Sequence, residues 1–188
     1  MLTSLPNLLT LARVAIIPVI VALLYVPVDW ARWTALIIYI LAALTDWLDG
    51  YLARKRNETS PLGRFLDPIA DKLLVTAVVV ILIANGSIGE VTAIPALVIL
   101  CREILVSGLR EYLAEMRIGM PVSRLAKWKT AAQMLAVALL ILGPAAPYGL
   151  SVLLPGKILL WVAGVLTAVT GYDYMVVGLR HMRRGPTT

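Results

Sequence analysis

The feature that most limits the fold of this chain is a series of six long apolar segments separated by short polar ones. A helix needs about 20 mainly apolar residues to cross the hydrocarbon core of a bilayer. Charged residues make up 15% of the chain and hydrophobic residues 60%, whereas a soluble domain has about 25% and about 45–50%. We therefore predict an all-α, polytopic membrane protein that forms a single domain over residues 1–188. The six predicted transmembrane helices are residues 8–26, 31–52, 63–84, 91–115, 123–142 and 157–177.

Charge and cysteine content exclude several other classes of protein. The formal net charge is +6, but the basic residues lie in short gaps between apolar segments rather than on one extended face, which argues against nucleic acid as a partner. The single cysteine, Cys101, cannot form a disulfide framework or a thiolate metal site within this chain. Residues 1–7 carry no basic residue, so we expect the first apolar segment to be a retained span rather than a signal peptide.

The distribution of Lys and Arg predicts the orientation in the membrane, because cytoplasmic loops are enriched in basic residues. With a cytoplasmic N-terminus, twelve basic residues fall on the cytoplasmic side, and only Arg32 and Lys157 fall on the outer side. We therefore expect both termini to be cytoplasmic. The twelve are Arg54, Lys55, Arg56, Arg64, Lys72, Arg117, Arg124, Lys127, Lys129, Arg180, Arg183 and Arg184.

Four of the six aspartates lie at the cytoplasmic ends of the second and third predicted helices. Asp46 and Asp49 are three residues apart, and Asp67 and Asp71 are four apart, so each pair lies on one face of its helix. In an antiparallel hairpin, two residues at equal depth, one from each helix, have numbers that add up to nearly the same total. This relation places Asp46 level with Asp71, and Asp49 level with Asp67. The sequence thus predicts four carboxylates that face one another.

Such a cluster requires cations, since four carboxylates in a poorly solvated place repel one another and otherwise protonate. Carboxylate oxygens suit hard divalent ions such as Mg²⁺ or Mn²⁺, whereas zinc prefers nitrogen and sulfur ligands. Two such ions about 3.5–4 Å apart form an arrangement used in phosphoryl transfer. We therefore predict a site for two divalent metal ions, Mg²⁺ or Mn²⁺.

Small and basic residues surround the aspartates. Gly50 and Ala53 continue the face of the first aspartate pair, and Gly63 precedes the second pair by one turn. The resulting bare wall either admits a flat ligand or allows close helix packing, and the sequence leaves both open. Four basic residues border the same mouth, where they either bind a phosphate-bearing substrate or only set the topology. They are Arg54, Lys55, Arg56 and Arg64.

Residues 46–71 match in full the pattern D-x2-D-G-x2-A-R-x8-G-x3-D-x3-D. This is the signature of the CDP-alcohol phosphotransferase family, which the chain resembles. Members of that family are six-helix membrane enzymes, usually homodimers, that displace CMP from a CDP-linked donor with an alcohol. The resemblance implies that Asp46, Asp49, Asp67 and Asp71 bind two metal ions. It also implies that Asp67 and Asp71 are catalytic, with Asp71 as the general base.

The resemblance also implies the substrates. Gly50, Ala53 and Arg54 would line the cytidine diphosphate site, and Gly63 would leave room for substrate. Further stretches resemble the bacterial members in which CDP-diacylglycerol meets glycerol 3-phosphate, with an active site at the cytoplasmic face of the cytoplasmic (inner) membrane. Inositol phosphate, serine and phosphatidylglycerol stay open as alternative acceptors. The stretches are residues 6–13, 102–111, 127–130 and 171–174.

An acceptor that carries its own phosphate needs fixed cations, and the fourth and fifth predicted helices supply them. Arg102 and Arg110 are eight residues apart and share a helix face, while Lys127 and Lys129 begin the next helix on the same side. We predict that these four residues bind the acceptor phosphate. Two alternatives stay open: Arg110 pairs with a glutamate of its own helix, or the lysines extend to lipid headgroups. Aromatic residues near the span ends, Tyr174 among them, are interpreted as interfacial residues without a chemical role.

A second hypothesis from a different class is a divalent-cation transporter or channel, because intramembrane carboxylates also suit ion conduction. Such a pathway needs polar residues through the full thickness of the membrane. The outer halves of the six predicted helices are almost purely apolar, and no paired repeats are evident. The sequence therefore favours the enzyme.

Overall fold

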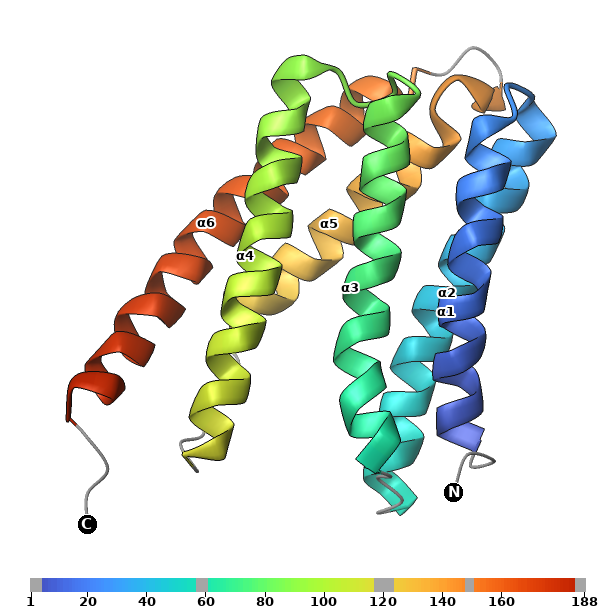
Figure 1. The fold of residues 1–188 in the computed structure, drawn as a ribbon. Helices are drawn as coiled ribbons and strands as arrows, with labels where there is room; N and C mark the ends of the chain where they lie inside the picture. Colours follow the sequence, from blue (N-terminus) through green and yellow to red (C-terminus); the bar gives the residue numbers. More distant parts are fainter. Residues whose placement is uncertain (1–4, 57–60, 117–123, 148–150, 185–188) are drawn as a thin grey trace.

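The computed structural model describes residues 5–56, 61–116, 124–147 and 151–184, and within these ranges the chain forms helices only (Figure 1). Inside them, the side chains of residues 46–56 and of Arg64 and Asp67 are among those that lie outside the description. The elements are α1 (Leu5–Tyr25), α2 (Asp29–Arg56), α3 (Pro61–Ala84), α4 (Glu90–Glu115), α5 (Arg124–Leu142), the short 3-10 helix η1 (Gly143–Ala145) and α6 (Leu153–Arg184).

Each predicted transmembrane segment corresponds to one of the six α-helices, and most boundaries agree within a few residues. The largest difference is in α6, which begins at Leu153 and continues to Arg184, beyond both ends of the predicted segment. Pro155 and Gly156 therefore belong to its first turn rather than to the preceding loop. Proline is tolerated there because the first turn of a helix does not use its backbone N–H groups.

Membrane character is clear for four helices of the described part. The stretches Leu8–Tyr25, Glu90–Ala114, Leu125–Ala145 and Leu153–Arg180 are long and apolar enough to cross a bilayer. Helices α2 and α3 carry the charged aspartate signature at one end, which shortens their uninterrupted apolar part. The prediction of an all-α membrane protein is thus confirmed in its general form.

Successive helices run in opposite directions, so the ends of the described chain, in α1 and α6, lie at the same end of the bundle (Figure 1). Helix α1 packs against both α2 and α3, while α6 packs against both α4 and α5. The two groups meet mainly through α5, which crosses toward α2, and through a shorter contact of α3 with α4. We call the end that holds the N-terminus of α1 the lower end, as it is drawn in Figure 1.

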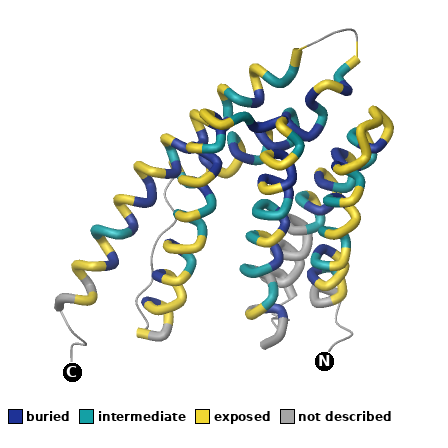
Figure 2. Tube along the Cα trace, turned by 45° about the horizontal axis from the view of Figure 1, so that its top comes forward, coloured by how far each residue is buried: buried dark blue, intermediate teal, exposed yellow. Residues whose placement is uncertain are grey.

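The hydrophobic core occupies the upper half of the bundle. Ile20, Leu82, Leu140 and Leu160 are fully buried there, whereas many large apolar side chains on the outer faces are exposed (Figure 2). Exposed apolar surface of this extent suits a lipid environment. Toward the lower end, buried apolar residues such as Leu113 are joined by buried polar ones, with Lys129 among them. The interior of the lower half therefore combines apolar packing with charged groups.

The upper end is fastened by hydrogen bonds between helices. The Arg32 guanidinium on α2 donates to the backbone oxygen of Ile141 at 3.1 Å and to Ser87 Oγ at 3.3 Å. The Trp33 indole donates to the backbone oxygen of Ala145 at 3.1 Å. Gly143, with φ of +47°, turns the chain beside Arg32. A Cβ at this glycine would lie 2.9 Å from Arg32 Nη1.

We expect Gly143→Ala to lower the melting temperature in detergent for two reasons. A left-handed backbone costs a non-glycine residue about 1–3 kcal/mol, and the new methyl displaces Arg32 from its acceptors. Gly86→Ala is the matched control, because Gly86 has φ of +77° but nothing within 4 Å of its Cβ position. The Gly86→Ala control should be destabilised only by the cost of placing alanine in a left-handed backbone conformation. Equal losses in the two variants would contradict a fastening role for Arg32.

Candidate functional site

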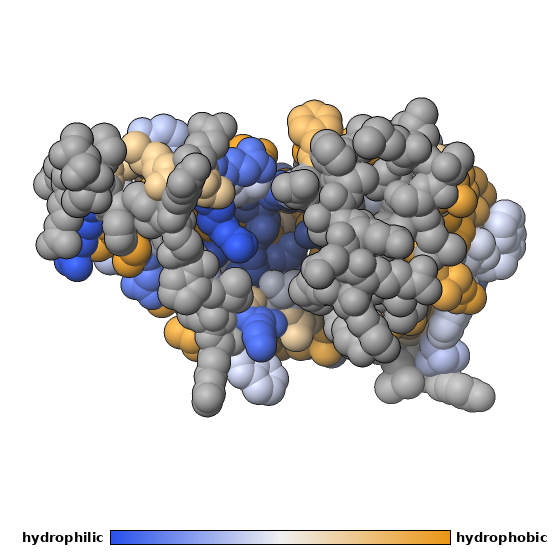
Figure 3. Space-filling view, turned by 90° about the horizontal axis from the view of Figure 1, so that it is seen from below, coloured by the Kyte–Doolittle hydropathy of each residue, from blue (hydrophilic) through white to orange (hydrophobic). Residues whose placement is uncertain are grey.

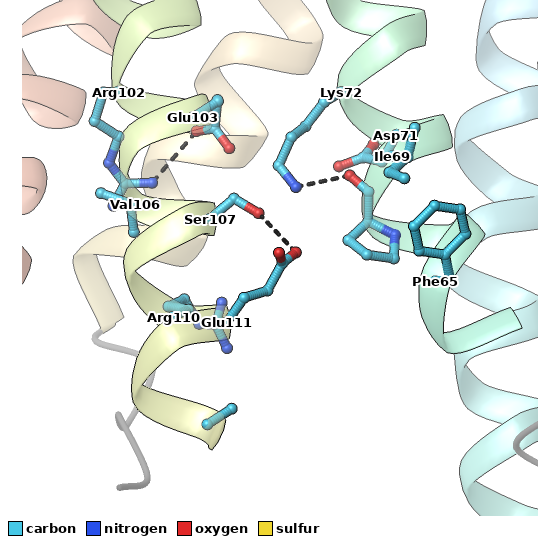
Figure 4. Close-up of a pocket in the computed structure, with 12 residues that line it drawn as sticks. Phe65, Ile69, Asp71, Lys72, Arg102, Glu103, Val106, Ser107, Arg110 and Glu111 are labelled. Carbon is cyan, nitrogen blue, oxygen red and sulfur yellow. Dashed lines mark hydrogen bonds and ion pairs between the residues drawn. The ribbon is translucent and has the colours of Figure 1, made fainter. Parts of the chain in front are cut away.

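A pocket of about 630 Å³ opens between α3 and α4 in the lower half of the bundle. Seen from below, hydrophilic side chains gather in a hollow of the surface (Figure 3). Figure 4 shows Asp71 and Lys72 on α3 facing Glu103, Ser107 and Glu111 on α4. The pocket is lined by Phe65, Pro68, Ile69, Asp71, Lys72, Arg102, Glu103, Val106, Ser107, Arg110, Glu111 and Ala114.

A second pocket of about 500 Å³ lies on the other side of the same α4 residues, against α5 and α6. Arg102, Glu103 and Arg110 line both pockets. Lys127 and Lys129 line the second pocket only. The predicted acceptor residues are therefore brought together, within reach of the space that Asp71 faces.

Glu103 is the carboxylate at the centre of this arrangement. It forms an ion pair with Lys129 that joins α4 to α5, and Arg102 Nη1 donates to the same oxygen, Oε1, at 3.4 Å. The Lys129 side chain is only 5% exposed and that of Glu103 is 24% exposed. Two cations thus share one carboxylate in a poorly solvated place, and the lining of the second pocket carries more cations than carboxylates.

Arg102 is held from α6 as well. Its Nη2 donates to Thr170 Oγ1 at 3.4 Å, and its guanidinium carbon lies 5.4 Å from the centre of the Tyr174 ring, a distance suited to cation–π attraction. Tyr174 is buried. Its interpretation as an interfacial residue was therefore wrong: the ring faces the protein interior because α6 turns it toward α4.

Two of the predicted cations are more accessible. Arg110 and Lys127 are exposed at the pocket walls, so they are available to a ligand from the aqueous side. The sequence alternative pairs Arg110 with Glu103 or Glu111 of its own helix. In the structure Glu103 pairs with Lys129 and Arg102, and Glu111 accepts from Ser107 Oγ.

Of the four signature aspartates, Asp71 is the one whose side chain the structure describes. It is exposed toward the first pocket, one residue before Lys72, whose Nζ donates to the Pro68 backbone oxygen at 2.7 Å. A solvent-accessible carboxylate of this kind is a suitable oxygen ligand for a hard divalent ion.

The remaining signature residues fall largely outside the described side chains. Helix α2 includes five of them, and α3 includes Asp67 and the buried Gly63. Within the described residues, no group of three or more potential metal-ligating side chains is found, and the predicted convergence of the four carboxylates stays a prediction. The α2 residues are Asp46, Asp49, Gly50, Ala53 and Arg54.

Sequence reasoning missed several residues that shape the site. Glu103 and Thr170 hold Arg102, and Ser107 Oγ donates to Glu111 Oε1 at 3.5 Å inside the first pocket. The spacing of four between Ser107 and Glu111 was a usable signal, because such residues are neighbours on a helix. Thr170 gave no such signal, since its contact joins helices far apart in the chain.

The family model for CDP-alcohol phosphatidyltransferases matches residues 3–169. The chain belongs to the CDP-alcohol phosphatidyltransferase family, and the resemblance inferred from residues 46–71 is confirmed. Membership of an enzyme family also decides between the two hypotheses, in favour of the enzyme and against the cation transporter.

Curated relatives are similar over almost the whole chain. A Rickettsia bellii protein is 48% identical over 91% of this chain and 93% of its own length. A Pseudomonas fluorescens protein is 43% identical over 96% and 92%, and an Escherichia coli (strain K12) protein is 41% identical over 92% and 93%. All three are named CDP-diacylglycerol–glycerol-3-phosphate 3-phosphatidyltransferase.

We expect Glu103→Ala to destabilise the protein markedly, because it leaves Lys129 and Arg102 as uncompensated charges inside the bundle. Removing one partner of a buried pair costs about 3 kcal/mol, which thermal unfolding in detergent would detect. Glu111→Ala is the control, since the Glu111 side chain is exposed and such changes stay within about 0.5 kcal/mol. A Glu103→Ala variant as stable as Glu111→Ala would show that the ion cluster is not structural.

Proposed function

We propose that this protein transfers the phosphatidyl group of CDP-diacylglycerol to glycerol 3-phosphate, giving phosphatidylglycerophosphate and CMP. The observation that carries this proposal is a pair of pockets on either side of Arg102, Glu103 and Arg110, with Asp71 facing one and two lysines lining the other. The names of the curated relatives agree with it. A soluble acceptor that brings its own phosphate suits a site with an excess of fixed cations.

The acceptor phosphate binds between Arg110 and Lys127 in this proposal. Both side chains are exposed in the second pocket, so they are free of the cost of breaking a buried ion pair. Arg102 and Lys129 stand behind them and add positive charge, with Glu103 fixing their positions. The acceptor is thereby anchored at its phosphate, and its terminal hydroxyl extends toward Asp71.

Asp71 acts as the general base. It removes the proton of the acceptor hydroxyl, whose oxygen forms a bond to the phosphorus of the phosphatidyl group as the bond from that phosphorus to CMP breaks. Asp46, Asp49, Asp67 and Asp71 would hold two divalent ions, Mg²⁺ or Mn²⁺. When bound, these ions supply positive charge at the phosphate oxygens of the donor.

The donor occupies the signature side of the site. Gly50, Ala53 and Arg54 of α2 line the cytidine diphosphate in this proposal, and the buried Gly63 of α3 leaves room for it. The acyl chains remain in the bilayer, since apolar surface covers the outside of the bundle. Donor and acceptor then approach Asp71 from opposite sides.

The finer topology completes the proposal. All six helices span the cytoplasmic (inner) membrane of a bacterium, with both termini and the active site on the cytoplasmic side. Support comes from the positive-inside pattern and from the common end at which α1 starts and α6 finishes (Figure 1). The enzyme acts as a homodimer, as the family resemblance implies.

Product identity tests the proposed reaction. Purified protein with CDP-diacylglycerol and Mg²⁺ or Mn²⁺ is offered glycerol 3-phosphate, inositol phosphate, serine or phosphatidylglycerol in separate reactions, and the lipid products are identified by mass spectrometry. We expect phosphatidylglycerophosphate from glycerol 3-phosphate, no turnover in excess chelator, and none with Asp71→Asn. Turnover with another acceptor but not with glycerol 3-phosphate would overturn the proposal.

Acceptor binding gives a separate prediction. Arg110→Ala removes a charge-assisted phosphate contact worth about 1.5–3 kcal/mol, so the KM for glycerol 3-phosphate should rise roughly ten- to hundredfold. The KM for CDP-diacylglycerol should change little. Lys157→Ala, on the predicted outer side, is the control and should change neither constant. An Arg110→Ala variant with a defect only in CDP-diacylglycerol would place the acceptor elsewhere.

A further inference from the structure

Helices α4 and α6 run parallel to each other and touch through a regular set of close contacts (Figure 1). Three glycines of α6 are spaced by seven residues, and each lies against an α4 residue of the same spacing. The pairs are Gly164 with Pro95, Gly171 with Arg102 and Gly178 with Leu109. A Cβ added at any of the three would lie 2.7 Å from its α4 partner, closer than atoms can approach.

The middle pair differs from the other two because its partner is charged. A Cβ at Gly171 would meet Arg102 Cγ at 2.7 Å, Nε at 3.5 Å and Cδ at 3.7 Å, so the stem of the arginine lies directly on the glycine. Cγ is near the base of the side chain and cannot move without moving the guanidinium. If Gly171 served only for helix packing, an apolar α4 residue would fit against it equally well, as Leu109 fits against Gly178.

Two polar contacts complete the support on the same face of α6. Thr170 Oγ1 donates to the Leu166 backbone oxygen at 2.8 Å and accepts from Arg102 Nη2 at 3.4 Å, so its orientation is fixed by its own helix. Tyr174, one turn further, lies under the guanidinium at 5.4 Å. The opposite guanidinium nitrogen, Nη1, is left to reach Glu103 and the pockets.

We propose that Gly171, Thr170 and Tyr174 of α6 are positioning residues that hold the Arg102 guanidinium at the acceptor pocket. The proposal rests on the proposed function, in which Arg102 contributes to acceptor-phosphate binding. Free arginine side chains have several rotatable bonds, and immobilising one on binding costs affinity. Gly171 contacts the stem of Arg102, Thr170 bonds one guanidinium nitrogen, and the Tyr174 ring lies against the guanidinium. These contacts order the side chain before the acceptor binds, so binding no longer carries that cost. These α6 residues thus act on the acceptor through Arg102, without touching the acceptor.

The first test compares two glycines of the same stripe. Gly171→Ala should displace Arg102 and raise the KM for glycerol 3-phosphate about tenfold, with the KM for CDP-diacylglycerol unchanged. Gly178→Ala adds the same methyl one repeat further along, where it meets only the flexible end of Leu109. It should leave both KM values unchanged. Equal effects of the two variants on the acceptor KM would overturn the proposal.

The second test adds no bulk, and it therefore holds even if Gly171→Ala fails to fold. Thr170→Val removes the acceptor of the Arg102 hydrogen bond and should raise the KM for glycerol 3-phosphate about threefold, while Thr170→Ser keeps the hydroxyl and should restore it. A Thr170→Val variant that lowers kcat or the melting temperature without changing that KM would overturn the positioning role.

Arg102→Ala separates this inference from the function on which it rests. If it raises the acceptor KM while the Gly171 and Thr170 variants do not, the positioning role alone is wrong. If it leaves that KM unchanged while glycerol 3-phosphate is still turned over, Arg102 does not contribute to acceptor binding and the positioning role fails with it. If glycerol 3-phosphate is not turned over by the unaltered protein, the proposed function itself is wrong.

Discussion

The lower half of this protein depends on one constraint: charges placed inside a helical membrane bundle must neutralise one another. Glu103 meets this constraint by pairing with Lys129 on α5 and with Arg102 on its own helix. Taking three charged groups from water is costly, and only mutual contact offsets the cost. Because the partners come from α4 and α5 and Arg102 is also bonded to α6, the cluster fixes the relative positions of three helices. Glu103 carries one negative charge against two cations, and the second pocket, which Arg110 and Lys127 also line, has an excess of positive charge.

Much of the fold follows from the sequence because a membrane restricts what an apolar segment can do. All six helices were predicted at nearly their observed positions, since each apolar segment is about as long as a bilayer is thick. The N-terminal extension of α6 was not, because Pro155 and Gly156 have the composition of a turn and yet Pro155 suits the first turn of a helix. The family could also be predicted, since residues 46–71 match its signature in full and lie within the match to the family model.

The contacts that hold the acceptor residues in place could not be predicted from the sequence in the same way. Helical periodicity shows which residues share a face, and it correctly grouped Arg102 with Arg110. It does not show which helix lies against that face. The bond from Arg102 to Thr170 spans 68 positions in the chain, and the pair formed by Glu103 and Lys129 spans 26. Such contacts depend on tertiary packing, so a buried tyrosine such as Tyr174 was interpreted from its place near a helix end instead of from its neighbours.

The parallel contact of α4 with α6 also limits how the protein can move. Three glycines spaced by seven residues receive three α4 side chains at the same interval, and sliding either helix by a single residue would misalign all three contacts at once. These two helices therefore keep one register, and α4 carries Arg102 and Arg110 in that fixed register. Helix α3, which bears Asp71, makes a shorter contact with α4 in the described part of the chain. The distance from Asp71 to the arginines of α4 is therefore set by a smaller contact than the one that holds α4 to α6.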